Sequence, residues 1–172
     1  MADDFTIDSK EFGDFYRAMS KIDPEVKKQL RKRLTDAAKP IVDEVRSVEL
    51  QIPAKAGSAA SKRKKRGETL GLRQSLAAAT VSEIKATKRG GAVHIRVSTT
   101  RFMAASGRPR TLPYYMEGRR KRPWRHPVYG NKQNWVTQSP HPFLGVTVQK
   151  HKDEFEKEVT SAVLDAIASV KP

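Results

Sequence analysis

The residues able to do chemistry in this sequence are few, and their spacing assembles no recognisable active site. The four histidines are His94, His126, His141 and His151, and none forms the HxH, HxxxH or HExxH spacing that brings two imidazoles to one metal ion. The chain has no cysteine, so no thiolate can complete a zinc site and no disulfide can form. We therefore expect no metal and no other cofactor.

Nucleophilic catalysis finds no better support. The sequence contains no GxSxG elbow and no glycine-rich phosphate loop ending in Lys-Ser or Lys-Thr. The carboxylates mostly face Lys or Arg on predicted helices, which is the pattern of solvated surface pairs. We expect the protein not to be an enzyme and assign no catalytic residue.

Positive charge is the strong compositional signal. The chain carries 34 Lys and Arg against 19 Asp and Glu, a formal net charge of +15. Such an excess favours a partner that is polyanionic or acidic: nucleic acid, an anionic membrane or an acidic protein surface. The residues predicted to face DNA or a protein partner lie in two tracts: Lys62, Arg63, Lys64, Lys65 and Arg66, and then Arg119, Arg120, Lys121 and Arg122. The alternative is that these tracts are solvated loops that keep the protein soluble.

A stretch of aromatic residues and prolines follows the second basic tract. Its distinctive residues are Trp124, His126, Pro127, Tyr129, Trp135 and Phe143. Trp, Tyr and Arg are enriched at interface hot spots, so these residues predict a contact between subunits. Buried aromatics could equally form a clasp that fixes a loop to the core, and the sequence leaves both interpretations open.

The length of 172 residues suits a single domain, residues 1–172, with one hydrophobic core. Hydrophobic residues make up only 37% of the chain, which suggests a thin, extended fold or one completed by neighbouring subunits. Residues 53–68 predict a basic flexible loop, and residues 100–142 predict an irregular arm rich in basic and aromatic residues, with at most short elements such as Leu112 to Glu117. No apolar run is long enough for a membrane span. The acidic N-terminus lacks the apolar segment of a secretory signal.

Apolar spacing predicts four helices. Residues 12–22 predict a short amphipathic helix, and Asp23-Pro24 marks the start of a long one, with Pro40 expected to kink or break it. Residues 69–79 predict a short helix, and a closing helix carries Val148, Phe155, Val159 and Val163 on one face. The long helix has one apolar stripe: Val26, Leu30, Leu34, Ala37, Ile41, Val45 and Val48.

A β-hairpin is predicted between the short helix and the arm. Residues 80–87 form one strand, residues 88–91 the turn and residues 92–99 the return strand, in which Val93, Ile95 and Val97 alternate with polar residues. The expected fold class is α+β, with a small antiparallel sheet and a β-hairpin flanked by a long N-terminal helix and a C-terminal helix, and with long basic loops.

The order of these segments resembles the HK-97-like tail-component family of siphophages, which includes head–tail joining and tail-completion proteins. The matching segments are Leu70 to Leu76, Val93 to Val97, His126-Pro127-Val128-Tyr129-Gly130, Trp135 to Gln138 and Pro142-Phe143. Tyr115-Met116-Glu117-Gly118 is similar to the segment that precedes the His-Pro motif in that family. The resemblance covers roughly residues 20–170.

The resemblance implies a structural virion protein of the phage neck, assembled in the host bacterial cytoplasm. Its subunits would form a homo-oligomeric ring, a hexamer, that contacts neighbouring head–tail connector and tail proteins around the DNA channel, with non-specific contact to DNA and no membrane partner. A tail terminator that caps the tail tube is the close alternative. A non-specific nucleic-acid-binding protein is the alternative from a different class.

Overall fold

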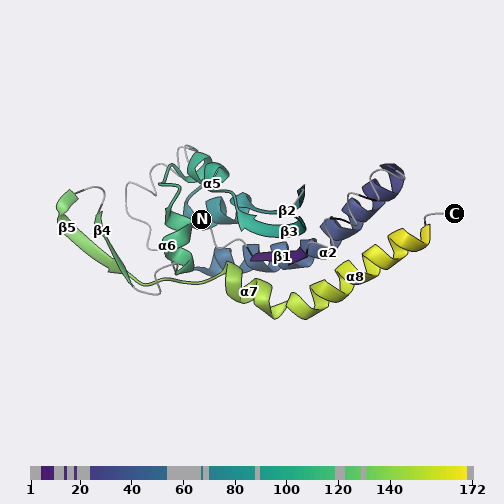
Figure 1. Ribbon diagram of the computed structural model, residues 1–172. Coiled ribbons are helices and arrows are strands. Elements are labelled where there is room, and N and C mark those ends of the chain that lie inside the picture. The colour runs from purple at the N-terminus through teal and green to yellow at the C-terminus, as the bar shows by residue number, and fades with distance from the viewer. Residues whose placement is uncertain are drawn as a thin grey trace.

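The computed structural model describes residues 5–9, 14, 18, 24–53, 67, 70–87, 90–118, 123–128 and 131–169. Their helices and strands confirm the α+β class (Figure 1). Most of the predicted loop 53–68, both basic tracts and most of the predicted helix 12–22 lie outside these residues. In chain order the elements are β1 (Phe5–Ser9), α2 (Pro24–Gln51), α4 (Leu72–Ala79), β2 (Thr80–Thr87), β3 (Gly90–Val97), α5 (Thr99–Ser106), α6 (Leu112–Glu117), β4 (Trp124–Val128), β5 (Asn131–Gln138), α7 (Leu144–Lys150) and α8 (Lys152–Ser169).

Helix α2 is the axis of the fold. It begins at Pro24, where proline's fixed φ suits the first helical position, and it runs for 28 residues, about 42 Å. The helix continues through Pro40, so the expected break does not occur, although Figure 1 shows α2 bending along its length. Pro40 is exposed, while Ala38 and Ile41 on either side of it are buried and hold the helix to the core. Packing therefore outweighs the loss of one backbone hydrogen bond.

The main sheet has three antiparallel strands in the order β1-β3-β2. The predicted alternation in β3 is confirmed, since Val93, Ile95 and Val97 are buried. The predicted four-residue turn is too long: Gly90 pairs with Thr87, so both glycines of that turn belong to β3. Strand β1 was not predicted, and it pairs with the other edge of β3.

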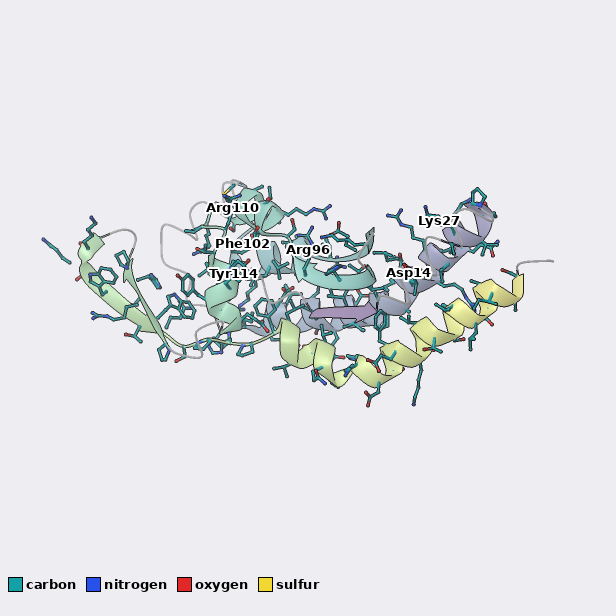
Figure 2. All side chains as sticks on the ribbon, viewed as in Figure 1. Asp14, Lys27, Arg96, Phe102, Arg110 and Tyr114 are labelled. Atoms are coloured by element: carbon teal, nitrogen blue, oxygen red, sulfur yellow. The ribbon has the colours of Figure 1, made fainter. Side chains whose placement is uncertain are left out.

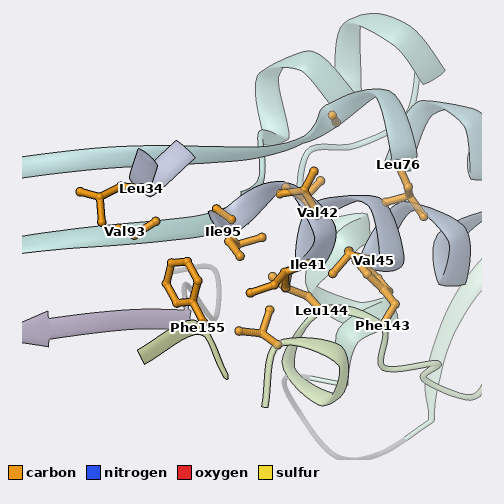
Figure 3. Close-up of a cluster of buried hydrophobic side chains, with 14 of the residues drawn as sticks. Leu34, Ile41, Val42, Val45, Leu76, Val93, Ile95, Phe143, Leu144 and Phe155 are labelled. Atoms are coloured by element: carbon orange, nitrogen blue, oxygen red, sulfur yellow. The ribbon is translucent and has the colours of Figure 1, made fainter. Parts of the chain in front are cut away.

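The core lies on both sides of α2. Figure 3 shows Leu34 near Val93 of the sheet, and Ile41 near Leu144 at the start of α7. Helix α8 runs beside α2 and buries Phe155. The molecule is long and thin (Figure 1). None of the helices described here is long and apolar enough to cross a membrane.

The segment 100–142 is more regular than predicted. Helix α6 has the predicted bounds, Leu112 to Glu117. However, Thr99–Ser106 forms helix α5, and strands β4 and β5 form a second antiparallel sheet. The Ser98 hydroxyl begins α5 by accepting a hydrogen bond from the Arg101 amide at 3.5 Å, and Gly107 ends it in the left-handed conformation. The prediction that residues 100–142 are irregular is therefore wrong, because this segment contains two helices and a β-hairpin.

Candidate functional site

The hairpin β4–β5, called the arm below, extends from the body of the protein (Figure 1). The two strands pair with each other and, among the described strands, with no third one. Residues 131–137 of β5 are all exposed, so neither face of this strand is covered by a core. A two-stranded hairpin alone is marginally stable in water, so the arm depends on its attachment or on a partner.

Exposed aromatic and cationic groups mark the outer part of the arm. The Trp135 side chain is 47% exposed, and its indole N–H donates to the Lys132 carbonyl at 2.7 Å. The Arg125 guanidinium lies 5.8 Å from the centre of the Trp135 ring, a cation–π distance. Val136, next along β5, is 41% exposed. Figure 2 shows the side chains of the arm directed into open space at this end of the molecule.

An aromatic pair fixes the inner end of the arm. The rings of Trp124 on β4 and Tyr115 on α6 lie 5.9 Å apart at an interplanar angle of 31°. His126 Nε2 lies 3.3 Å from the side-chain oxygen of Gln138, which joins β4 to the end of β5. These contacts order the half of the arm that is nearest the body.

Glu117 closes the base of the arm. Its Oε2 accepts hydrogen bonds from the backbone amides of Phe143 and Leu144 at 2.9 and 3.0 Å, and its Oε1 accepts from Gly145 at 2.7 Å. These amides open α7, and Phe143 at the N-cap offers no side-chain acceptor. The carboxylate therefore caps a helix 26 residues further along the chain.

Two further contacts reinforce this base. The His141 amide donates to the Met116 carbonyl at 2.7 Å. Gly118, which ends α6, has a φ of 89°, and a Cβ there would lie 3.2 Å from the Pro140 side chain. The chain thus leaves the body at Gly118 and returns at Phe143 within one hydrogen-bonded junction.

A buried carboxyl group lies near the end of α2, close enough to Glu117 for the charge of Glu117 to help raise its pKa. Glu49 near the end of α2 is fully buried, and burial raises its pKa from 4.5 to about 7. The Thr80 hydroxyl lies 2.7 Å from Glu49 Oε1 and 3.2 Å from the Leu76 carbonyl. The Arg46 guanidinium donates to the Thr80 carbonyl at 3.0 Å, so Glu49 sits in a small polar cluster at the α2–β2 contact.

Two other carboxylates have pKa values below their ordinary value, for a different reason. Hydrogen bonds from Lys150 and His151 lower the pKa of Glu44, which ties the α7–α8 junction to α2. A hydrogen bond from Arg96 across the β2–β3 pair lowers the pKa of Glu83. These are exposed or half-exposed surface pairs, which orient helices and strands and contribute little stability.

The predicted clasp or interface residues separate into two groups. Trp124, His126 and Pro127 lie on β4 and Trp135 on β5, whereas Phe143 is buried in the core at the start of α7. Trp124 and Phe143 have the half-buried or buried positions expected of a clasp, while Trp135 is exposed. Tyr129 and the nine residues of the two basic tracts, Lys62 to Arg66 and Arg119 to Arg122, lie outside the described residues.

Glu117 and Glu49 were not singled out by the sequence. The one signal for Glu117 is that it is the last acidic residue before a long stretch, Gly118 to Lys152, with no Asp or Glu. Within the described part of the chain, no group of three or more His, Cys, Asp or Glu residues could hold a metal ion. The hydrogen bonds of Glu117 hold the base of the arm, and Arg125 with Trp135 gives the arm a cationic and aromatic surface that a macromolecule could contact.

Comparison with known proteins adds no relative. Neither the family models, nor the curated proteins, nor the solved structures contain a match to this chain.

Proposed function

We propose that this chain is a structural assembly protein of the phage neck, which forms a ring that completes the tail and joins it to the head connector around the DNA channel. The observation that carries the proposal is the arm, whose exposed Trp135 and Val136 lie on a two-stranded sheet outside the core. Aromatic side chains in such a position are typical of interface hot spots. Contact with a neighbouring protein would cover them.

The order of the elements supports the same proposal. A long helix, a leucine-containing short helix and a β-hairpin precede the His-Pro segment, and a Pro-Phe pair then begins the C-terminal helices. This is the order on which the resemblance to the HK-97-like tail-component family rests. The fold class alone would fit many functions, so the arm and this order carry the proposal together.

Non-specific nucleic-acid binding is a second candidate, favoured by the net charge of +15. If that were the main role, affinity for duplex DNA would fall steeply with salt and depend little on sequence. In a neck ring the same charge would meet the DNA that passes through the channel. The two functions therefore predict different phenotypes: loss of a neck protein should leave heads and tails unjoined, whereas loss of a DNA-binding protein should not.

The test is electron microscopy of lysates from a phage that carries a nonsense mutation in this gene. We expect filled heads beside separate tails of normal length. Overlong tails would instead assign the protein as the tail terminator. Intact, infectious particles would refute a neck function and leave nucleic-acid binding to be pursued.

Complementation of the same mutant tests the arm. Trp135→Ser should fail to restore joined particles although the protein is expressed and folded. Met103→Ser on α5 is the matched control, because Met103 is exposed to a similar extent, 42% against 47%. Full rescue by Trp135→Ser would show that the arm is not the contact on which assembly depends.

A further inference from the structure

Charge is divided unevenly between the arm and α8. From Trp124 to Gln138 the arm has no Asp or Glu and carries the basic residues Arg125 and Lys132. In the sequence before it, Arg119, Arg120, Lys121 and Arg122 add four more positive charges. Helix α8 (Lys152–Ser169) carries five acidic residues and two basic ones, Lys152 and Lys157. Its acidic residues are Asp153, Glu154, Glu156, Glu158 and Asp165, and Lys152 lies 3.8 Å from Glu156. In a chain with a net charge of +15, α8 is thus a local acidic surface.

Two acidic residues of α8 share a face with exposed apolar ones, with Lys157 at the edge of that face. Asp153, Glu156, Thr160, Leu164 and Ile167 recur at three- and four-residue steps and form one stripe, called the outer stripe below. Leu164 is 60% exposed and Ile167 is 50% exposed. The other face of α8, with Phe155, packs against α2, so the outer stripe is directed away from its own core.

The arm presents the complementary chemistry. Arg125 and Lys132 supply positive charge, and Trp135 and Val136 supply exposed apolar surface. The acidic half of the outer stripe matches the two cations, and its apolar half, Leu164 with Ile167, matches the aromatic and aliphatic pair.

The two surfaces cannot meet within one molecule. In Figure 1 the arm lies at one end, and the C-terminal half of α8 lies at the opposite end. If the arm of one copy contacts α8 of another, each added copy still offers a free arm and a free outer stripe. Such a contact is heterologous, so it can close a ring.

We infer that the arm docks on the outer stripe of α8 in a second copy of this chain. The inference deepens the proposed ring and rests on that function only for its place in the particle. Duplex DNA would also attract Arg125 and Lys132, but it would leave the exposed Leu164 and Ile167 of the acidic helix uncovered. A second copy covers both surfaces at once.

Charge reversal on purified full-length protein tests the docking. The arm variant is Arg125→Glu with Lys132→Glu, and the stripe variant is Asp153→Lys with Glu156→Lys. We expect the wild-type chain to associate reversibly in sedimentation velocity, and each variant to associate at least about tenfold more weakly. The two variants mixed, or one chain carrying all four changes, should associate again because opposite charges then face each other.

The control variant carries Lys32→Glu and Lys39→Glu, which reverse two exposed charges on α2 and should leave association unchanged. Circular dichroism confirms that every variant is folded. A wild-type chain that stays monomeric at high concentration would overturn the inference. So would a stripe variant that associates like wild type, or mixed variants that remain apart.

The affinity of the arm variant for duplex DNA tests whether the arm binds nucleic acid instead of a second copy. Loss of DNA affinity with unchanged self-association would assign the arm to nucleic acid and overturn the docking. Failure of the neck function has a different signature, since infectious particles from the nonsense mutant would leave the association of the purified chain intact.

Discussion

Glu49 offers a quantitative test of the core, because its burial predicts an unusual dependence of stability on pH. Burial disfavours a charge on Glu49, and this outweighs the hydrogen bond that the Thr80 hydroxyl donates to Glu49 Oε1, which favours the ionised form. The second carboxyl oxygen, Oε2, is buried without a hydrogen-bond partner among the described residues, so a negative charge on Glu49 is poorly compensated there. The folded state should therefore bind a proton that the unfolded state has already lost.

The sign and size of the effect follow from the two pKa values. The pKa is raised from 4.5 in the unfolded chain to about 7 in the folded protein. The stabilising contribution is fully present below pH 4.5 and is lost as pH rises through 7. Because each pKa unit corresponds to about 1.4 kcal/mol, the folded state loses roughly 3 kcal/mol over this range.

The replacement Glu49→Gln isolates this contribution. The amide keeps the shape of the side chain, and its oxygen can accept the hydrogen bond from Thr80, but it does not titrate. We expect the free energy of unfolding of Glu49→Gln, minus that of the wild type, to increase by roughly 3 kcal/mol between acidic and alkaline pH. Urea denaturation followed by circular dichroism across this range measures the difference, and other titrating groups cancel in it.

A matched control removes the same charge elsewhere. Glu158→Gln on the exposed surface of α8 should shift stability by at most about 0.5 kcal/mol at every pH. If the difference between Glu49→Gln and wild type is constant with pH, Glu49 does not hold a proton in the folded state. The account of its burial would then be wrong.

Three further predictions concern the base of the arm and the first basic tract. Glu117→Ala should lower the free energy of unfolding by roughly 2–4 kcal/mol and speed hydrogen exchange of the amides that open α7, because a charged acceptor of three hydrogen bonds is lost; an effect no larger than that of Glu158→Ala would contradict it. Gly118→Ala should lower the melting temperature more than Gly67→Ala, since both glycines have positive φ but only the first meets a neighbouring proline. Deletion of Ser61 to Arg66 should leave the circular dichroism spectrum unchanged but reduce particle yield in complementation. Normal yields would contradict that prediction.

Local patterns predicted the parts of the fold that have one buried face. The stripe of α2 from Val26 to Val45 is confirmed in its buried members, because a helix packed on one side repeats its apolar residues at the helical period. The same logic predicted Val93 to Val97 in β3. These elements carry their own signal, since burial on one side imposes a period on the sequence.

The arm lacked such a signal. Strand β5 is exposed along nearly its whole length, so no alternation of apolar and polar residues was required of it. Strand β4 contains Pro127, which argues against a strand unless the strand lies at an edge, as it does in this two-stranded sheet. The sequence pattern therefore predicts an irregular segment where the structure has a hairpin.

The carboxylates that organise the structure were also beyond local prediction. Glu117 contacts residues 26 to 28 positions away, and Glu49 contacts Thr80 at a separation of 31. Nothing in the neighbouring sequence distinguishes either residue from a solvated surface acid. Their roles depend on which elements pack together, and that is settled only by the tertiary fold.

The thin fold and the uncovered apolar residues have a common physical origin. With 37% hydrophobic residues, the chain builds a narrow core around α2, and a narrow core leaves a large surface for its volume. Two of the exposed apolar groups lie at opposite ends, Trp135 with Val136 on the arm and Leu164 with Ile167 on α8. Their burial between copies would stabilise an assembly in a way that the isolated chain cannot achieve. Stability of the folded chain should then increase with protein concentration, and the arm and stripe variants should lose that dependence together.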